Sequence, residues 1–260
     1  MQYYELTLVL VAALAIGSFL NVLIYRLPRK IQFTKGRSVC PGCGATIKWY
    51  HNIPLLSYAA LRGRCSYCRM RIPVRYPLVE LINALGWLYF YHTYSWSVDF
   101  GIYAFLTSAL VVIFFIDMEH QIIPDKITFP GMVLGLLVAL VPGGLTIAQA
   151  AIGLVVGGGS LYLVALLGDW LFKKESMGGG DIKMAAMLGA FLGWQKVLLI
   201  FLASAVIGLI ISIILMGFSA RLREKRVVPY GPFIALAAVV AILWGDSLIS
   251  YYVHNWLLPG

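Results

Sequence analysis

Charged side chains are scarce in this sequence: Asp, Glu, Lys and Arg make up 12% of its 260 residues, whereas 61% are hydrophobic. The mean hydropathy is +0.86, and several apolar runs reach or approach the length of about 20 residues that a helix needs to cross a bilayer. Heptads, long repeats and low-complexity tracts are also missing. The scarcity of charge therefore predicts an integral membrane protein rather than a soluble globular domain.

Acidic residues are absent between Arg26 and Arg75, although this stretch holds eleven Lys or Arg. The net charge of +9 would also suit a nucleic-acid partner. However, positive charge gathered beside an apolar run is what the cytoplasmic loop of a membrane protein requires. The distribution therefore favours the lipid bilayer over nucleic acid as the neighbour of these residues.

The apolar runs predict an all-α polytopic fold with helices at 5–25, 77–95, 100–116, 127–142, 147–171 and 231–256. The run 184–218 would be about 50 Å long as one helix, against a hydrocarbon core of about 30 Å. A polar break, GWQK at Gly193 to Lys196, divides it. With two crossings there, Arg221 to Arg226 return to the cytoplasm, and of the 20 Lys and Arg only Lys196 lies outside. This asymmetry predicts eight spans with both termini outside.

The first apolar run has no basic segment before it and is followed by positive charges, so it should insert with its N-terminus outside. The predicted organisation is a first transmembrane helix at 1–25, a basic cytoplasmic loop at 26–76 and a seven-helix membrane core at 77–260.

The four cysteines form two pairs, CPGC at Cys40 and Cys43 and CSYC at Cys65 and Cys68. Each turn directs two thiolates at one point, and two turns supply the four sulfurs of a tetrahedral zinc site. The pairs lie in the predicted cytoplasmic loop, where disulfides are disfavoured. We therefore predict a structural zinc in a zinc-knuckle loop, since a closed four-thiolate site has no open position for catalysis. Redox-active dithiols and incidental cysteines are the alternatives.

Five of the eleven acidic residues crowd two junctions on the predicted cytoplasmic side, IDMEHQIIPD (Asp117, Glu119, Asp125) and ESMGGGD (Glu175, Asp181). Acids at membrane depth are costly and often functional. Asp125 and Asp181 would also suit helix caps, and Glu119 and Glu175 would suit solvated loops. Asp117 is harder to explain structurally, because an acid at the end of a helix opposes the helix dipole.

The depths of Asp117 and Asp181 suggest a pair. Asp181 to Trp194 is 13 steps, about 20 Å of helix, so Asp181 lies below the inner surface if Trp194 marks the outer one. Asp99 to Asp117 is about 27 Å, which places Asp117 at or just inside the cytoplasmic boundary. Two Asp side chains that share a proton can activate water against a peptide carbonyl. The glycines before Asp181 would let a substrate backbone approach closely.

The motifs together resemble the type IV prepilin peptidase family of bacterial inner membranes. The ordered set comprises GSFLNVLIYRLP, CPGCG, WYHNIPLLSY, GRCSYC, RYPLVE, IDMEHQIIPD and MGGGDIKM. The resemblance implies an eight-span membrane aspartic protease whose catalytic residues are Asp117 and Asp181. It implies that the substrates are prepilins and pseudopilins, whose basic leaders are cleaved at the cytoplasmic face for pilus biogenesis or type II secretion.

Methylation of the new amino terminus, with S-adenosylmethionine as donor, is implied by the resemblance alone. No G-x-G-x-x-G after a strand marks a Rossmann-type nucleotide site. Glu80 and Asn83 are polar residues in an otherwise apolar run and are the candidates for a methyl-transfer site. Hydrogen bonding between helices is the alternative role for both.

Five further residues are candidates for supporting roles at the active site: Gly178, Gly180, Lys183, Glu175 and Asp125. Lys183 either holds a charge of the carboxylate pair or extends to the membrane interface. Glu175 either contacts the cationic leader or is solvated.

Two other classes of protein fit parts of the pattern. Acids at partial depth, glycine-broken helices and a short span also occur in transporters, but no inverted repeat is visible. A membrane anchor whose cysteine loop binds nucleic acid or a protein would leave the two aspartates without a role. Leader cleavage measured against ion flux separates the peptidase from a transporter.

Overall fold

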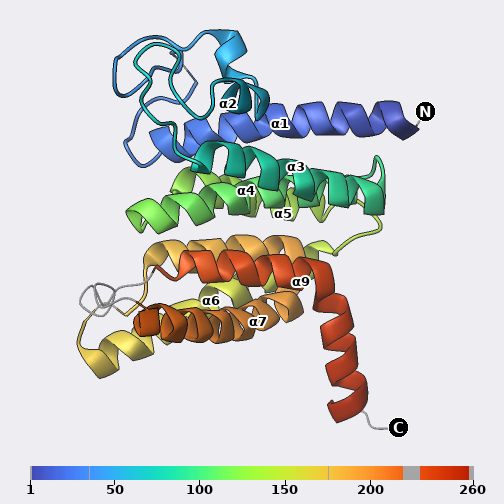
Figure 1. The fold of residues 1–260 in the computed structure, drawn as a ribbon. Helices are drawn as coiled ribbons and strands as arrows, with labels where there is room; N and C mark the ends of the chain where they lie inside the picture. The colour runs from blue at the N-terminus through green and yellow to red at the C-terminus, as the bar shows by residue number, and fades with distance from the viewer. Residues whose placement is uncertain (1, 35, 175, 219–228, 258–260) are drawn as a thin grey trace. The chain divides into compact units, whose positions relative to one another are not determined.

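The computed structural model describes residues 2–34, 36–174, 176–218 and 229–257, and it is helical throughout its regular structure. No named strand occurs in these ranges, which hold only two isolated β-bridges. The chain forms two compact units, 1–116 and 117–260. The helices are coloured along the chain in Figure 1. The predicted all-α fold is confirmed.

Unit 1 contains α1 (Gln2–Arg26), η1 (Trp49–Asn52), α2 (Leu56–Ala60), α3 (Arg75–Tyr94) and most of α4 (Val98–His120). Hydrogen bonds hold α1 against α3 in antiparallel order: the Asn83 amide donates to the Ala13 carbonyl at 2.8 Å, and the Asn21 amide donates to the Tyr76 carbonyl at 3.0 Å. Between these two links the helices touch at Gly17, where a Cβ would lie 2.8 Å from Glu80 Cα. The two helices therefore run side by side over their length.

Unit 2 contains the last turn of α4, then α5 (Asp125–Val138), α6 (Ile147–Phe172), α7 (Gly179–Phe218), α9 (Gly231–Tyr252) and η2 (Val253–Leu257). Small residues let α6 and α7 approach closely. A Cβ on Gly153 would lie 2.1 Å from the Gly189 carbonyl oxygen, and one on Gly157 would lie 2.4 Å from that of Ala185. The backbones of α6 and α7 are therefore in direct contact.

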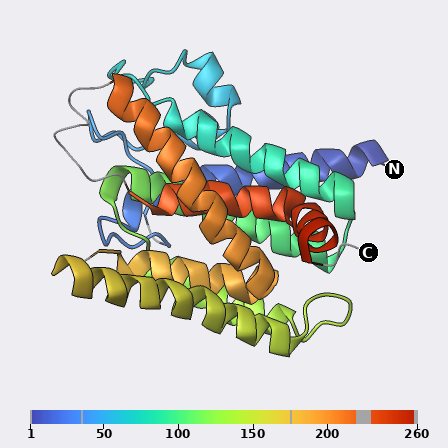
Figure 2. The same cartoon turned by 90° about the horizontal axis from the view of Figure 1, so that it is seen from below.

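The α7 segment is two helices joined at Gly193, whose backbone is non-helical at φ 79° and ψ 168°. Figure 2 shows the two halves running in different directions. Glycine adopts a positive φ without the steric penalty that a side chain would add. The predicted break at GWQK is confirmed, whereas Arg221 to Arg226, on the predicted cytoplasmic loop, lie outside the described residues.

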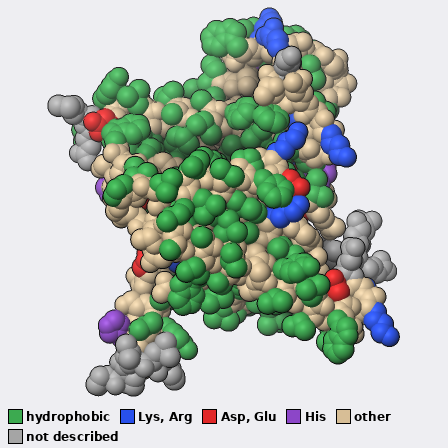
Figure 3. Space-filling view, turned by 180° about the vertical axis from the view of Figure 1, so that it is seen from behind, with side chains coloured by type: hydrophobic (Ala, Val, Ile, Leu, Met, Phe, Trp, Pro, Cys, Tyr) green, Lys and Arg blue, Asp and Glu red, His purple; other side chains and the backbone are tan. Residues whose placement is uncertain are grey.

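Within the residues that the structure describes, five helices are long and apolar enough to cross a membrane: Tyr3–Arg26, Val98–His120, Ile147–Phe172, Gly179–Ile214 and Gly231–Asn255. Hydrophobic side chains cover much of the face shown in Figure 3. Exposed apolar surface of this kind needs a lipid environment. The membrane protein class is confirmed, and the count of eight crossings stays a prediction.

Candidate functional site

Asp117 lies in the last turn of α4 with only 5% of its surface exposed. Its carboxylate accepts a hydrogen bond from the backbone N–H of Gly231, the first residue of α9. The first N–H groups of a helix have no partner within the helix, and that end carries partial positive charge. Asp117 opposes the dipole of its own helix, but it is placed at the favourable end of another helix.

Asp181 is the third residue of α7 and is partly buried. Its carboxylate accepts a hydrogen bond from the backbone N–H of Gly178, which precedes the helix. This is the return bond of a capping box, so Asp181 does cap its helix, although from the third position. Asp181 and Asp117 are also close enough for their negative charges to repel one another. The structure thus brings the two predicted acids together, each at the start of a helix.

The glycines of the GxGD motif differ in the space around them. A Cβ on Gly180 would lie 2.9 Å from Ile123 Cβ, and one on Gly178 would lie 3.2 Å from Asp181 Oδ2, whereas one on Gly179 would meet nothing within 4 Å. The two candidate glycines, Gly178 and Gly180, are therefore sterically restricted, and the glycine between them is free to change.

Ile123 contacts the starts of both helices, α7 and α9, beside which the two carboxylates lie. It lies in the short segment between α4 and α5, and it packs against both Gly180 and Gly231. A Cβ on Gly231 would lie 2.6 Å from Asp117 Oδ2 and 3.1 Å from Ile123 Cδ1. The starts of α7 and α9 therefore both pack against Ile123, and the start of α9 also packs against Asp117.

Three residues at this site were not among those predicted from the sequence: Gly231, Tyr230 and Ser204. The Tyr230 hydroxyl and the Ser204 hydroxyl lie 2.6 Å apart, and the Tyr230 side chain interacts electrostatically with Asp181. Ser204 is fully buried on the second half of α7. The signal for Gly231 was present as YGPF, since a proline in the first turn marks a helix start.

Lys183 pairs with Asp125, so two of the predicted supporting residues bind each other. Its Nζ lies 2.7 Å from Asp125 Oδ1 and 5.3 Å from the centre of the Phe129 ring. Asp125 is in the first turn of α5 and does not cap that helix through its side chain. Both partners are exposed, with 36% and 55% of their side chains accessible, so the pair contributes little stability. Glu175 lies outside the described residues.

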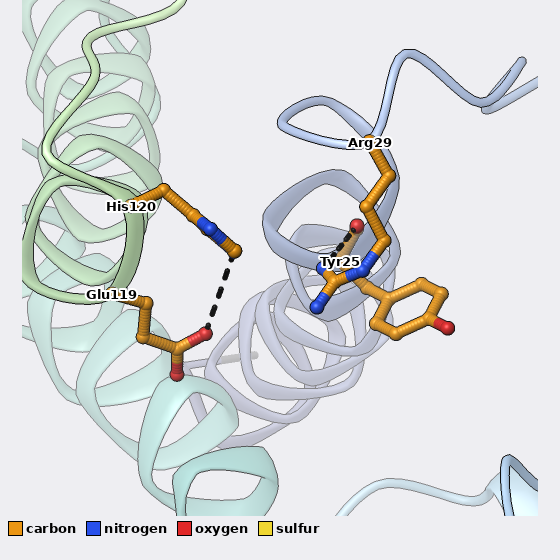
Figure 4. Close-up of polar contacts among 4 residues, drawn as sticks. All are labelled: Tyr25, Arg29, Glu119 and His120. Atoms are coloured by element: carbon orange, nitrogen blue, oxygen red, sulfur yellow. Dashed lines mark hydrogen bonds and ion pairs between the residues drawn. The ribbon is translucent and has the colours of Figure 1, made fainter.

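Glu119 and His120 follow Asp117 at the end of α4, and their side chains face each other in Figure 4. Glu119 Oε2 lies 4.0 Å from His120 Nε2, which is too far for a hydrogen bond. They form a weak ion pair when His120 is protonated.

The four cysteines lie together in unit 1. Their Sγ atoms are all within 4.8 Å of one another, and those of Cys40 and Cys68 are 3.8 Å apart. Four sulfurs at the zinc–sulfur distance of about 2.3 Å are separated by about 3.8 Å in a tetrahedron. A disulfide needs about 2.05 Å, and all four thiols are free. The cluster is close enough to bind a metal ion, as predicted.

Two similar turns build this cluster. In the first, the Cys40 N–H donates to the Ala45 carbonyl at 2.9 Å, and Val39 bridges to Thr46. In the second, the Cys65 N–H donates to the Met70 carbonyl at 2.9 Å, and Arg64 bridges to Arg71. The two turns therefore present their thiols in the same way.

Backbone N–H groups aimed at the sulfurs favour thiolates. The pKa of Cys65 is lowered to about 7, chiefly by the N–H groups of Cys68 and Tyr67. The N–H of Met70 likewise acts to lower the pKa of Cys68, but partial desolvation and the neighbouring thiols raise that pKa to about 11. A set of four sulfur donors is suited to a metal that prefers thiolate ligands.

Glu80 and Asn83 lie in unit 1 on α3. Asn83 is fully buried; besides donating to Ala13, it accepts a hydrogen bond from Ser108 of α4 at 2.7 Å. Glu80 accepts the backbone N–H of Leu55 at 2.9 Å and a hydrogen bond from Ser18. Both side chains link segments of unit 1.

Comparison with known proteins gives two matches to family models. Residues 11–94 match the bacterial peptidase A24 N-terminal domain, and residues 104–213 match the type IV leader peptidase family. Curated relatives named prepilin leader peptidase/N-methyltransferase include one from Pseudomonas putida, 39% identical over 99% of this chain and 96% of its own length. Another, from Aeromonas hydrophila, is 37% identical over 96% of this chain and 94% of its length. No solved structure gave a significant match.

Proposed function

This chain belongs to the type IV leader peptidase family, and we propose that Asp117 and Asp181 are its catalytic pair. Cleavage of prepilin leaders and N-methylation of the new amino terminus are the activities of this family, and they are the activities of this chain. One observation carries this assignment: two acids that are far apart in the sequence lie close together in space, where α7 and α9 begin.

Water attack on the scissile carbonyl follows from a pair that shares one proton. The ionised carboxylate takes a proton from water, and the hydroxide equivalent bonds to the carbonyl carbon while the protonated partner hydrogen-bonds the carbonyl oxygen. The tetrahedral intermediate then collapses as the carbon–nitrogen bond breaks, and the leaving amine takes a proton from the pair. The two N–H groups, of Gly178 and Gly231, hold the carboxylates through both steps. Because the pair titrates as a unit, neither acid is assigned a fixed role.

The glycines leave room for a substrate and keep the two carboxylates in position. Gly180 and Gly231 fit against Ile123 and Asp117, whereas Gly179 faces open space. A substrate strand can approach closely at Gly178 and Gly179, which carry no side chains. Asp125 is neutralised by Lys183, so we propose that Lys183 does not serve the catalytic pair directly.

We propose that the four cysteines hold a structural zinc ion. The S···S spacing fits tetrahedral coordination, and a closed thiolate set supplies no open position for a substrate. The metal would stabilise a loop too small to form its own core.

For methyl transfer we propose S-adenosylmethionine as the donor and the region of Glu80 and Asn83 as its site. The donor supplies an electrophilic methyl group on a sulfonium cation. Glu80 is the only carboxylate between Arg26 and Tyr94, and it would face that positive charge. Asn83 uses both its amide nitrogen and its oxygen to link α1 and α4, so its part is to hold α3 in place.

We propose that the protein lies in the bacterial inner membrane with both termini periplasmic and the catalytic pair toward the cytoplasm. The eleven cationic residues between Arg26 and Arg75 support this orientation. The partners are prepilins and pseudopilins with basic leaders, rather than nucleic acid.

The test replaces each acid by its amide. Asp117→Asn and Asp181→Asn should each lower kcat for leader removal by about 1000-fold or more, since each removes a group that acts in the transition state. Asp99→Asn, an acid in the first turn of α4, is the control. Purified protein is incubated with a prepilin and S-adenosylmethionine, and mass spectrometry reports loss of the leader and gain of one methyl group. Cleavage at the control rate by either amide variant would refute the pair.

A further inference from the structure

An uncharged segment lies within the basic loop. From Trp49 to Leu61 the sequence WYHNIPLLSYAAL contains no Asp, Glu, Lys or Arg, and it is bounded by Lys48 and Arg62. It forms η1, a short connection and α2. Its largest apolar side chains point outward: Trp49 is 74% exposed and Leu56 is 69% exposed. Such exposure is unfavourable in water and needs a partner.

The depth of this segment follows from one hydrogen bond. The backbone N–H of Leu55 donates to Glu80 Oε2 at 2.9 Å, and Glu80 packs against Gly17 of α1. Gly17 precedes the end of α1 at Arg26 by nine residues, which is about 13 Å of helix. Because α1 is apolar and long enough to span a membrane, this contact places Leu55 beside α1 and α3, on the membrane side of Arg26, instead of beyond the ends of the helices.

The backbone at Leu55 is held in an uncommon conformation, φ 58° and ψ −48°. A non-glycine residue rarely has a positive φ, and such strain persists only where surrounding contacts impose it. The contact here is the buried Glu80 carboxylate, which also binds Ser18 of α1. The hydrogen bond between Leu55 and Glu80 turns the chain so that α2 begins at the next residue, Leu56, whose side chain is exposed.

An aromatic row continues the surface. The Trp49 and Tyr50 rings meet edge to face with centres 5.7 Å apart, and the Tyr50 and His51 rings are 4.5 Å apart. Lys48 Nζ lies 5.7 Å from the Tyr50 ring centre. Trp and Tyr are favoured where hydrocarbon meets headgroups, and flanking basic residues bind the phosphates of anionic lipids.

We propose that residues 49–61 are an interfacial anchor that inserts into the leaflet at which α1 ends, with anionic phospholipid as its partner. Trp49 and Leu56 enter the acyl region, and Lys48 and Arg62 contact headgroup phosphates. The anchor fixes the four-cysteine turns, which lie on both sides of it in the sequence, against the membrane surface. This proposal does not depend on the assignment of the catalytic pair.

The first experiment uses the wild-type protein in nanodiscs that contain phosphatidylglycerol with a diazirine on its acyl chain. After illumination, mass spectrometry should find lipid adducts within residues 49–61, together with adducts on α1. Val39, which is 55% exposed in the first cysteine turn, should carry none. Adducts on α1 without any on residues 49–61 would overturn the proposal. Protection of this segment by added RNA in place of lipid labelling would assign it to nucleic acid instead.

The second experiment measures trypsin cleavage after Arg62 in the same bilayers. Leu56→Glu should raise that rate by about tenfold, because a charge at the interface weakens insertion. Val39→Glu is the matched control and should leave the rate unchanged, and the wild-type rate should rise when the bilayer contains only neutral lipid. Equal rates for Leu56→Glu and Val39→Glu would contradict insertion of α2.

Discussion

Unit 1 and unit 2 both bury polar side chains among apolar helices, but the partners of those side chains differ. In unit 1, Asn83 bonds to a carbonyl of α1 and to the Ser108 hydroxyl of α4, which also lies 3.1 Å from the Trp87 indole nitrogen. In unit 2, Asp117 and Asp181 each accept one backbone N–H bond and repel one another, and Asp181 also interacts electrostatically with Tyr230. Groups whose hydrogen bonds are made within their own chain hold helices together, whereas a carboxylate that accepts a single N–H bond keeps further acceptor positions, as the proposed catalytic role of the pair requires.

The largest loss of free energy should come from disrupting the cysteine cluster of unit 1. Replacing Cys40 and Cys65 by Ser should remove a metal-binding free energy of about 10 kcal/mol or more, as in structural zinc sites. We expect loss of one zinc per chain by elemental analysis and faster trypsin cleavage in the loop. Leader cleavage at 20 °C, with the protein kept folded in mild detergent, should persist. Its abolition would indicate that the metal acts in proteolysis.

The next effect concerns the alignment of the pair in unit 2. Gly231→Ala would place a Cβ 2.6 Å from Asp117 Oδ2, so the carboxylate must move. We expect kcat for leader removal to fall by about 100-fold, the scale of a misplacement near 1 Å. Gly179→Ala, whose Cβ meets nothing within 4 Å, is the control and should retain full activity. Similar losses in both variants would mean that the close packing of Gly231 against Asp117 is not what activity depends on.

A smaller effect tests the structural role of Asn83. Asn83→Ala leaves the buried Ser108 hydroxyl and Ala13 carbonyl with fewer partners, which should cost about 1–3 kcal/mol of stability. Thermal unfolding in detergent should show a lower Tm, while kcat per folded molecule for leader cleavage stays unchanged. Thr93→Ala, which removes an exposed bond to its own helix, provides the comparison. A specific loss of cleavage at wild-type Tm would assign Asn83 to the chemistry.

The smallest effect is expected at the exposed pair of unit 2. Lys183→Met should change stability by less than about 1 kcal/mol, because Lys183 and Asp125 are both accessible to solvent. Asp125→Asn should have the same effect, and the double variant should be no worse than either. A large fall in kcat with Lys183→Met alone would show that this lysine serves the catalytic pair after all.

Local patterns predicted much of this molecule. Apolar runs placed the helices, and the polar GWQK sequence predicted the break at Gly193. The spacing of CPGC and CSYC predicted that four sulfurs would converge. In each case the information lies within a short stretch, because helix length and turn geometry are determined locally.

Contacts between distant segments were beyond sequence reasoning. Gly231 follows Asp117 by 114 positions, and nothing near either residue specifies that the N–H of one bonds the carboxylate of the other. Lys183 lies two residues from Asp181 but pairs with Asp125 on another helix. Helix packing decided both contacts. Methyl transfer was likewise invisible in the residues, and it enters only through similarity to relatives.

The starts of α7 and α9 give the proposed active site its own electrical balance. Each helix start carries about half a positive elementary charge, so the two together supply about one. A carboxylate pair that shares a proton carries one negative charge. The helix dipoles therefore bring the site close to neutral without help from Lys183, and this lysine is free to bind Asp125. A membrane-embedded hydrolase can thus hold its charge on backbone dipoles, which no single side-chain substitution removes.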